Sequence, residues 1–179
     1  MSEYLVKLFM EALRQNENIE YLNQLAETRR RDESWLINLL INQLSKIDKA
    51  KSIERNKYYP DGWETCDLFF AIEPHNYWIE VKTLPTNYCG GCGRPITDFI
   101  KMEVKMTLYK LGKVKNGKNK CMLVAAFYPF CNSEREAEEW DTHLGRIYKF
   151  CDAFLQSYEL EEEKISLGGW KAKIYFIWC

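Results

Sequence analysis

The sequence predicts a mixed α/β domain in which helices cover a central mixed β-sheet. Segments with helical periodicity and segments with strand-like periodicity alternate along the chain, which is typical of this class. Apolar residues make up 46% of the 179 residues, enough for a core of a single domain spanning residues 1–179. Pro74-His75-Asn76 separates two strand-like runs, as the turn of an antiparallel hairpin would. The expected element order is α-α-β-β-α-β-α-β.

The individual elements follow from the spacing of apolar residues. Helices are expected near residues 5–13, at about 32–47, from Thr97 onward and over Glu134–Tyr158; strands are expected at Cys66–Ile72, Tyr77–Thr83, Cys121–Phe130 and Lys171–Trp178. After Thr97 an alternating pattern competes with the helical one. Residues 48–60 are polar and end in a turn signal, and the acidic run Glu161–Lys164 resembles a solvated loop.

Several protein classes receive no support from the sequence. No apolar run approaches the roughly 18–20 residues that cross a bilayer, and the first residues lack a basic region followed by an apolar stretch. We therefore expect a cytoplasmic protein without membrane contact. Seven scattered cysteines favour buried free thiols over a disulfide framework. Cys89-Gly90-Gly91-Cys92 is half of a zinc knuckle; without a second such pair, a flexible loop is the better interpretation, with zinc or redox chemistry as the alternative.

Positive charge concentrates in the middle of the chain. Residues 82–120 carry nine basic and two acidic side chains, although the whole chain has a net charge of −1. Lys101 and Lys105 lie one helical turn apart, and Lys113 and Lys115 follow near a basic loop. These four lysines are candidates for contacts with nucleic-acid phosphates. A solvated helix face followed by a lysine-rich loop is the alternative.

The predicted hairpin carries the most informative residues. A period of two places Glu80 and Lys82 on one face of their strand, with Ile79 and Val81 on the other. Asp67 enters the apolar run of the partner strand. Two carboxylates and a main-chain carbonyl are hard oxygen ligands that suit Mg²⁺ or Mn²⁺. The alternative is a cross-strand salt bridge on an exposed sheet face.

These residues resemble the motif of the PD-(D/E)XK nuclease superfamily, whose members have the restriction-endonuclease-like fold. The resemblance rests on Asp67 and on Glu80-Val81-Lys82, followed by helix, strand, helix and strand. It implies that Asp67 and Glu80 bind the metal, that Val81 donates its carbonyl and that Lys82 assists the attacking water. It also suggests Glu33, on the first core helix, as a further member of the metal shell, unless Glu33 is a plain acid at a helix N-terminus.

One feature of the sequence departs from the family pattern. The literal Pro-Asp pair is Pro60-Asp61, which precedes Gly62 in an expected turn. Asp67 is preferred as the first acid because a metal ligand is better fixed on a strand than on a turn, and Asp61 is held in reserve.

The resemblance implies a Mg²⁺- or Mn²⁺-dependent endonuclease that hydrolyses nucleic-acid phosphodiester bonds, with DNA as the expected substrate. Cleavage of both strands of a duplex would favour a homodimer. The alternative function is a non-catalytic module that keeps the nuclease-like fold and binds nucleic acid or a protein.

Overall fold

The structure is a computed structural model that describes residues 2–86, 88, 96–131, 134–167 and 169–179. The described elements are α1 (Ser2–Leu13), α2 (Asn16–Thr28), α3 (Glu33–Leu44), β1 (Lys51–Arg55), β2 (Leu68–Ile72), β3 (His75–Pro85), α4 (Ile96–Phe99), the π-helix η1 (Ile100–Val104), α5 (Lys105–Val114), β4 (Asn119–Phe130), α6 (Glu134–Phe154), β5 (Glu159–Leu167) and β6 (Trp170–Trp178). The Cys89–Cys92 motif lies outside the described residues.

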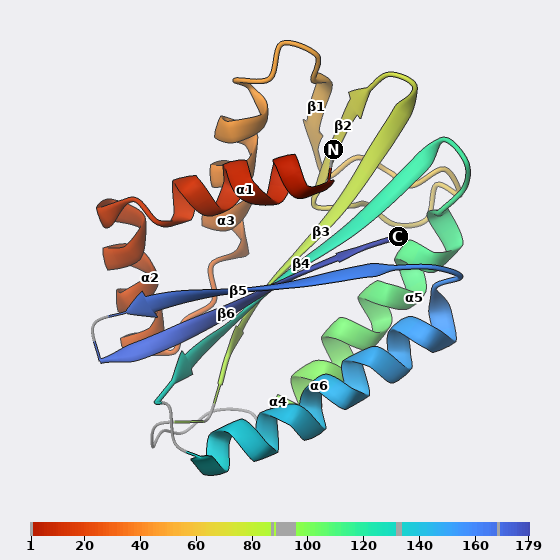
Figure 1. The fold of residues 1–179 in the computed structure, drawn as a ribbon. Helices are drawn as coiled ribbons and strands as arrows, with labels where there is room; N and C mark the ends of the chain where they lie inside the picture. Colours follow the sequence, from red (N-terminus) through yellow and green to blue (C-terminus); the bar gives the residue numbers. More distant parts are fainter. Residues whose placement is uncertain (1, 87, 89–95, 132–133, 168) are drawn as a thin grey trace.

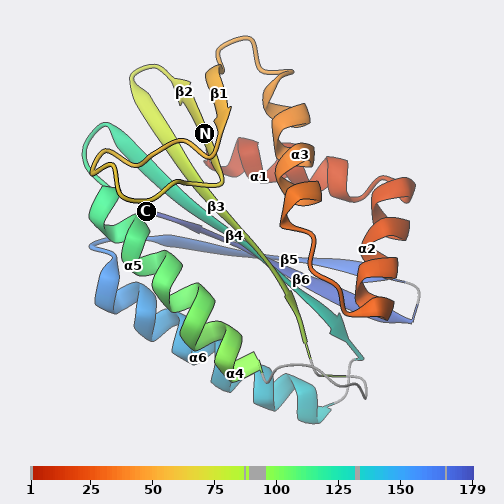
Figure 2. The ribbon, with the colours of Figure 1, turned by 180° about the vertical axis from the view of Figure 1, so that it is seen from behind.

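A six-stranded mixed sheet forms the centre of the molecule, with strand order β1-β2-β3-β4-β6-β5. Strands β3 and β4 are parallel, and every other neighbouring pair is antiparallel. Helices α1, α2 and α3 cover one face, whereas α4, α5 and α6 cover the other (Figures 1 and 2). The prediction of a mixed sheet flanked by helices is therefore confirmed.

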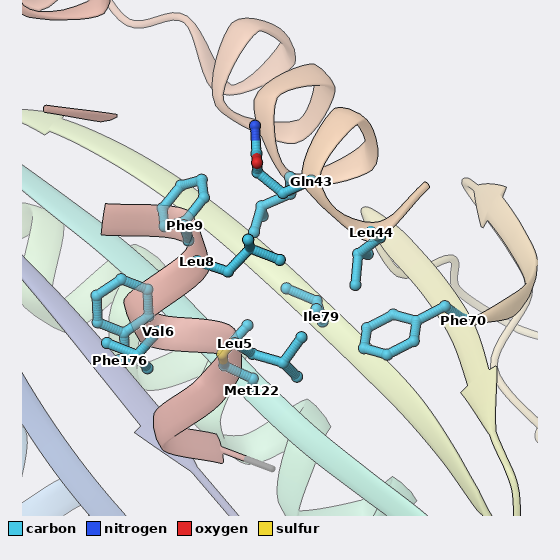
Figure 3. Close-up of a pocket in the computed structure, with 11 residues that line it drawn as sticks. Leu5, Val6, Leu8, Phe9, Gln43, Leu44, Phe70, Ile79, Met122 and Phe176 are labelled. Carbon is cyan, nitrogen blue, oxygen red and sulfur yellow. The ribbon is translucent and has the colours of Figure 1, made fainter. Parts of the chain in front are cut away.

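Alternation along β3 supplies side chains to both faces of the sheet. Tyr77, Ile79 and Val81 join the core beneath α1–α3, whereas Trp78 and Leu84 join the core beneath α5 and α6. Figure 3 shows how closely α1 and α3 pack on the first face, around a cavity of about 10 Å³. That volume is at the lower limit for one water molecule, and the walls are apolar except for Gln43. This core therefore offers no ligand site.

The predicted element order is incomplete, because two strands and one helix were missed. Strand β1 and helix α2 have no counterpart in it, and the acidic run Glu161–Lys164 is part of β5 rather than a loop. Strands β1 and β5 form the two edges of the sheet. An edge strand is open to solvent and is often protected by charged residues, so the alternation of apolar residues is weak there. In β5, for example, Glu163 pairs with Arg14 at 2.8 Å.

Three further expectations differ in detail from the structure. The segment after Thr97 is helical, as the first of the two competing patterns predicted, but it contains a π-helical turn at Ile100–Val104. Asp67 lies one residue before β2 rather than inside a strand. Cys66, Cys121, Cys151 and Cys179 are buried free thiols as expected, whereas Cys131 takes part in a disulfide. Among the described residues, no helix is both long and apolar enough to cross a membrane.

Candidate active site

Strand β3 extends well beyond the end of its partner β2. The β2–β3 pairing runs from Ile72 and His75 to Leu68 and Ile79. Beyond Ile79, β3 continues to Pro85 alongside β4. Backbone groups on the edge that β2 has left need other hydrogen-bond partners.

Acidic side chains take over the hydrogen bonds that β2 no longer makes. The backbone N–H of Val81 donates to Oδ2 of Asp67 at 2.7 Å, and that of Thr83 donates to Oε1 of Glu33 at 3.4 Å. Glu33 reaches the sheet because α3 begins there, where the backbone N–H of Asp32 donates to Oγ1 of Thr83 at 3.1 Å. The N-terminus of a helix also favours a negative side chain. The main chain of β3 thus helps to hold both acids in place.

The ammonium group of Lys82 lies among three carboxylates. Its Nζ is 3.5 Å from Oε2 of Glu33, 3.5 Å from Oδ2 of Asp67 and 3.7 Å from Oε2 of Glu80. It also donates to the carbonyl oxygen of Val81 at 2.9 Å. The side chains of Lys82 and Glu80 are only 14% and 4% exposed. Lys82 therefore forms ion pairs as the alternative predicted, including one with Asp67, but they do not lie on an exposed sheet face.

Glu80 is the most deeply buried of the three acids. Burial raises its pKa to about 7, and the nearby Asp67 carboxylate acts in the same direction. Tyr59 donates a hydrogen bond to Oε1 of Glu80 at 2.6 Å, which opposes this rise, as do the ammonium groups of Lys82 and Lys110. Near neutral pH, Glu80 is therefore divided between its protonated and ionised forms, and an added cation would favour the ionised form.

Lys82 remains charged in this environment. Burial acts to lower its pKa, but the carboxylates of Asp67, Glu33 and Glu80 outweigh burial, and the net shift is upward. We call Glu33, Asp67, Glu80 and Lys82 the inner group. It has one ammonium group for three acids, which leaves an excess of negative charge. An excess of negative charge that is partly buried is costly, and a further cation would reduce this cost.

Two further basic residues lie next to the inner group, Arg31 beside Glu33 and Lys110 near Glu80. Arg31 contacts Glu33 at 2.5 Å and Glu103 on η1 at 2.7 Å, and these contacts raise the pKa of Arg31. Lys110 on α5 contacts Glu64 at 2.5 Å and lies 3.9 Å from Oε1 of Glu80. Each of these cations is shared with another glutamate, so neither is devoted to the inner group.

The structure brings Asp67, Glu80, Lys82 and Glu33 together and leaves the reserve candidate Asp61 apart. Asp61 lies in an exposed turn, where its carboxylate accepts the backbone N–H of Trp63 at 3.4 Å.

The four candidate lysines are spread along η1, along α5 and just beyond the end of α5. Lys101 is exposed on η1, Lys105 lies over the ring of Phe150 on α6, and Lys113 lies over the ring of Tyr109. Lys115 instead donates to the backbone oxygen and to Oγ of Ser157, both at 2.8 Å, at the connection between α6 and β5.

The oxygen atoms of the inner group suit a hard divalent cation. Among the residues that the structure describes, no three Asp, Glu, His or Cys side chains are arranged so that they could hold a metal ion by themselves. Mg²⁺ does not need such a cage, because it keeps several water ligands and commonly binds through one or two carboxylates and substrate phosphates. Asp67, Glu80 and the carbonyl of Val81 provide such a partial set, and the bond from Lys82 already marks that carbonyl as accessible to a cation.

The sequence did not indicate Tyr59 or Lys110 as parts of this site. Tyr59 belongs to the polar segment before Pro60, where no periodicity marks it. Its burial and its bond to Glu80 depend on how residues 56–67 fold against β3. The only hint was a tyrosine pair, Tyr58-Tyr59, in an otherwise polar stretch.

Comparisons with models of known protein families, with characterised proteins and with solved structures found no match to this chain. The fold and the site geometry therefore provide the basis for a functional proposal.

Proposed function

We propose that this chain is a divalent-metal-dependent nuclease of the restriction-endonuclease-like class that hydrolyses phosphodiester bonds, with DNA as its substrate. The observation that carries the proposal is the convergence of Glu33, Asp67 and Glu80 around Lys82 beside the free edge of β3. A single structural ion pair needs one acid for one base, whereas three acids lie around Lys82 here.

The proposed roles follow from the position of each group. Asp67, Glu80 and the Val81 carbonyl would hold Mg²⁺ or Mn²⁺, which when bound can activate water and neutralise charge that develops on a phosphate. Lys82 supplies a fixed positive charge for the water or for the phosphate oxygens. Glu33, on the other side of Lys82, helps to hold the ammonium in its orientation. Tyr59 holds the carboxylate of Glu80 in place.

Cleavage assays with matched variants test this proposal. Wild-type protein is incubated with single-stranded and duplex DNA and with RNA, with Mg²⁺, with Mn²⁺ or with EDTA. We expect cleavage that requires the metal and that is lost in Asp67→Asn and in Lys82→Met. Asp67→Asn is a mild change, because the amide oxygen can still accept the N–H of Val81. Asp98→Asn, which changes an exposed acid on α4, is the control and should retain full activity.

The alternative is a binding module that has no catalytic activity. It is favoured by the direct bond between Lys82 and the Val81 carbonyl, because that ammonium occupies an oxygen that the metal would need. Binding of nucleic acid by the wild type, with no cleavage under any metal condition while the protein remains folded, would support this alternative and exclude the nuclease.

A further inference from the structure

The connection between β1 and β2 carries two exposed aromatic side chains. Trp63 is 87% exposed and Tyr58 is 66% exposed. The ring of Trp63 has no aromatic or cation–π partner among the described residues. A single exposed aromatic residue is ordinary on a protein surface, but Trp63 is distinguished by the place where the fold holds it.

Hydrogen bonds and an ion pair hold the segment around Trp63 beside the candidate active site. Tyr59 and Glu64 are joined by a backbone hydrogen bond of 2.8 Å, and the N–H of Gly62 donates to the carbonyl of Tyr59 at 2.8 Å. Gly62 has a φ of +76°, a conformation that glycine adopts without strain. These bonds make residues 59–64 a closed turn with Trp63 near its tip.

Both ends of this turn contact the residues around Glu80. At one end, the hydroxyl of Tyr59 donates to Glu80 at 2.6 Å. At the other end, Glu64 pairs with Lys110, whose Nζ lies 3.9 Å from Glu80. Figure 2 shows the connection running from β1 toward the end of α5 and back to β2. Trp63 therefore directly precedes Glu64, which is linked to the candidate site through Lys110.

Helix α5, beside this turn, offers charges that suit phosphate groups. Lys113 is exposed and lies over the ring of Tyr109, which is itself 41% exposed, and Lys110 faces the turn through its contact with Glu64. The inner acids repel a polyanion, so an approaching strand needs compensating positive charge nearby. Lys113 is exposed beside the turn that carries Trp63, near Asp61 and Glu64. Lys110 pairs with Glu64, so a phosphate would share its ammonium group with that carboxylate.

We infer that Trp63 stacks against an unpaired base next to the cleavage position, while Lys110 and Lys113 contact the adjoining phosphates. The substrate class is then single-stranded nucleic acid, or a duplex whose end carries unpaired bases. In an intact duplex the base faces are already stacked on their neighbours, whereas an unpaired base has a free face for an indole ring. This inference rests on the proposed function, because it takes the Glu80 region as the cleavage position.

Binding measurements separate this inference from catalysis. All variants are made in the Asp67→Asn background and kept in EDTA, so that no strand is cut. Fluorescence anisotropy then compares a labelled thymidine oligonucleotide with a blunt duplex. We expect the single strand to bind more tightly than the duplex.

Substitutions at Trp63 give the decisive comparison. Stacking of one base is worth about 1–3 kcal/mol, so Trp63→Ala should weaken binding of the single strand by roughly 5- to 150-fold. Trp63→Phe should restore most of the affinity, and binding of the blunt duplex should be unchanged. Tyr4→Ala is the control, because Tyr4 is 52% exposed on α1, which covers the opposite face of the sheet.

Three results would overturn the inference: equal affinity of Trp63→Ala and its parent for the single strand, equal loss for single strand and duplex, or no binding of either nucleic acid. The two assays together distinguish failure of this inference from failure of the nuclease proposal. Metal-dependent cleavage by the wild type, together with single-strand binding that Trp63→Ala leaves unchanged, would refute only the stacking role. Trp63-dependent binding by a chain that cuts nothing would refute only the nuclease.

Discussion

Substitution of Glu80 by glutamine should stabilise the protein at alkaline pH. The glutamine amide is nearly the same size as the carboxylate and can still accept the hydrogen bond from Tyr59, which spans 2.6 Å in the wild type. It cannot ionise, so the unfavourable buried charge disappears. The substitution therefore isolates the electrostatic cost of one proposed metal ligand.

The sign and the size of the effect follow from the pKa of Glu80. Its value rises from 4.5 to about 7 on folding, so the folded protein binds more protons than the unfolded chain between these pH values. Stability contributed by the neutral carboxyl is present at low pH and is lost as the pH rises through this window. Between pH 5 and pH 8 the wild type should lose about 2–3 kcal/mol through this group, since one pKa unit corresponds to about 1.4 kcal/mol.

Urea denaturation of the wild type and of Glu80→Gln at a series of pH values measures this difference. In metal-free buffer, the free energy of unfolding of Glu80→Gln relative to the wild type should increase by about 2–3 kcal/mol from pH 5 to pH 8. For a chain of this size, that corresponds to roughly 5–10 °C in melting temperature. A difference that stays constant with pH, or that decreases, would refute the assignment of Glu80 as a buried acid with a raised pKa.

Three other predictions concern the packing and the polar network of the fold. Gly112→Ala should destabilise the protein by about 2 kcal/mol or more, because a Cβ at this position would lie 2.2 Å from the backbone oxygen of Phe154. Thermal melting measures this loss of stability. Gly145→Ala is the matched substitution in a helix, because a Cβ at this position would have no atom within 4 Å; it should leave the stability of the protein unchanged or increase it by up to about 1 kcal/mol. A similar loss of stability in both variants would contradict the packing of α5 on α6. Tyr175→Phe should lower the free energy of unfolding, measured by urea denaturation, by about 1–3 kcal/mol. The reason is that the hydroxyl of Tyr175 accepts the indole N–H of Trp140 at 2.7 Å and donates to Glu162. An unchanged denaturation midpoint would show that these hydrogen bonds add nothing to stability.

The sequence predicted best those elements whose burial is asymmetric or complete. Strands β3 and β4 lie at the centre of the sheet and helix α3 packs on one of its faces, so the periodicity of their apolar residues reflects the core directly. Strands β1 and β5 were missed because they form the sheet edges and carry many charged residues. Their strand conformation depends on pairing with β2 and β6, which a local pattern cannot reveal.

The residues of the candidate site also differ in how well the sequence predicted them. Asp67, Glu80 and Lys82 stood out because charged side chains interrupt apolar runs, and a buried charge needs a partner. Their relation to Glu33 depends on the place where α3 meets β3, a contact between residues 50 positions apart. Tyr59 and Lys110 were predictable neither from spacing nor from composition, since each reaches Glu80 through the tertiary fold.

Titration of the metal-free protein with Mn²⁺ in a calorimeter tests most directly whether these acids form a cation site. The wild type should bind Mn²⁺, Asp67→Asn should bind it much more weakly, and Lys82→Met should bind it at least as tightly as the wild type. The last expectation follows because Lys82 shares the Val81 carbonyl and the surrounding carboxylates with any bound ion. Absence of Mn²⁺ binding in all three proteins, or identical binding by the wild type and Asp67→Asn, would contradict the metal site on which the proposed nuclease depends.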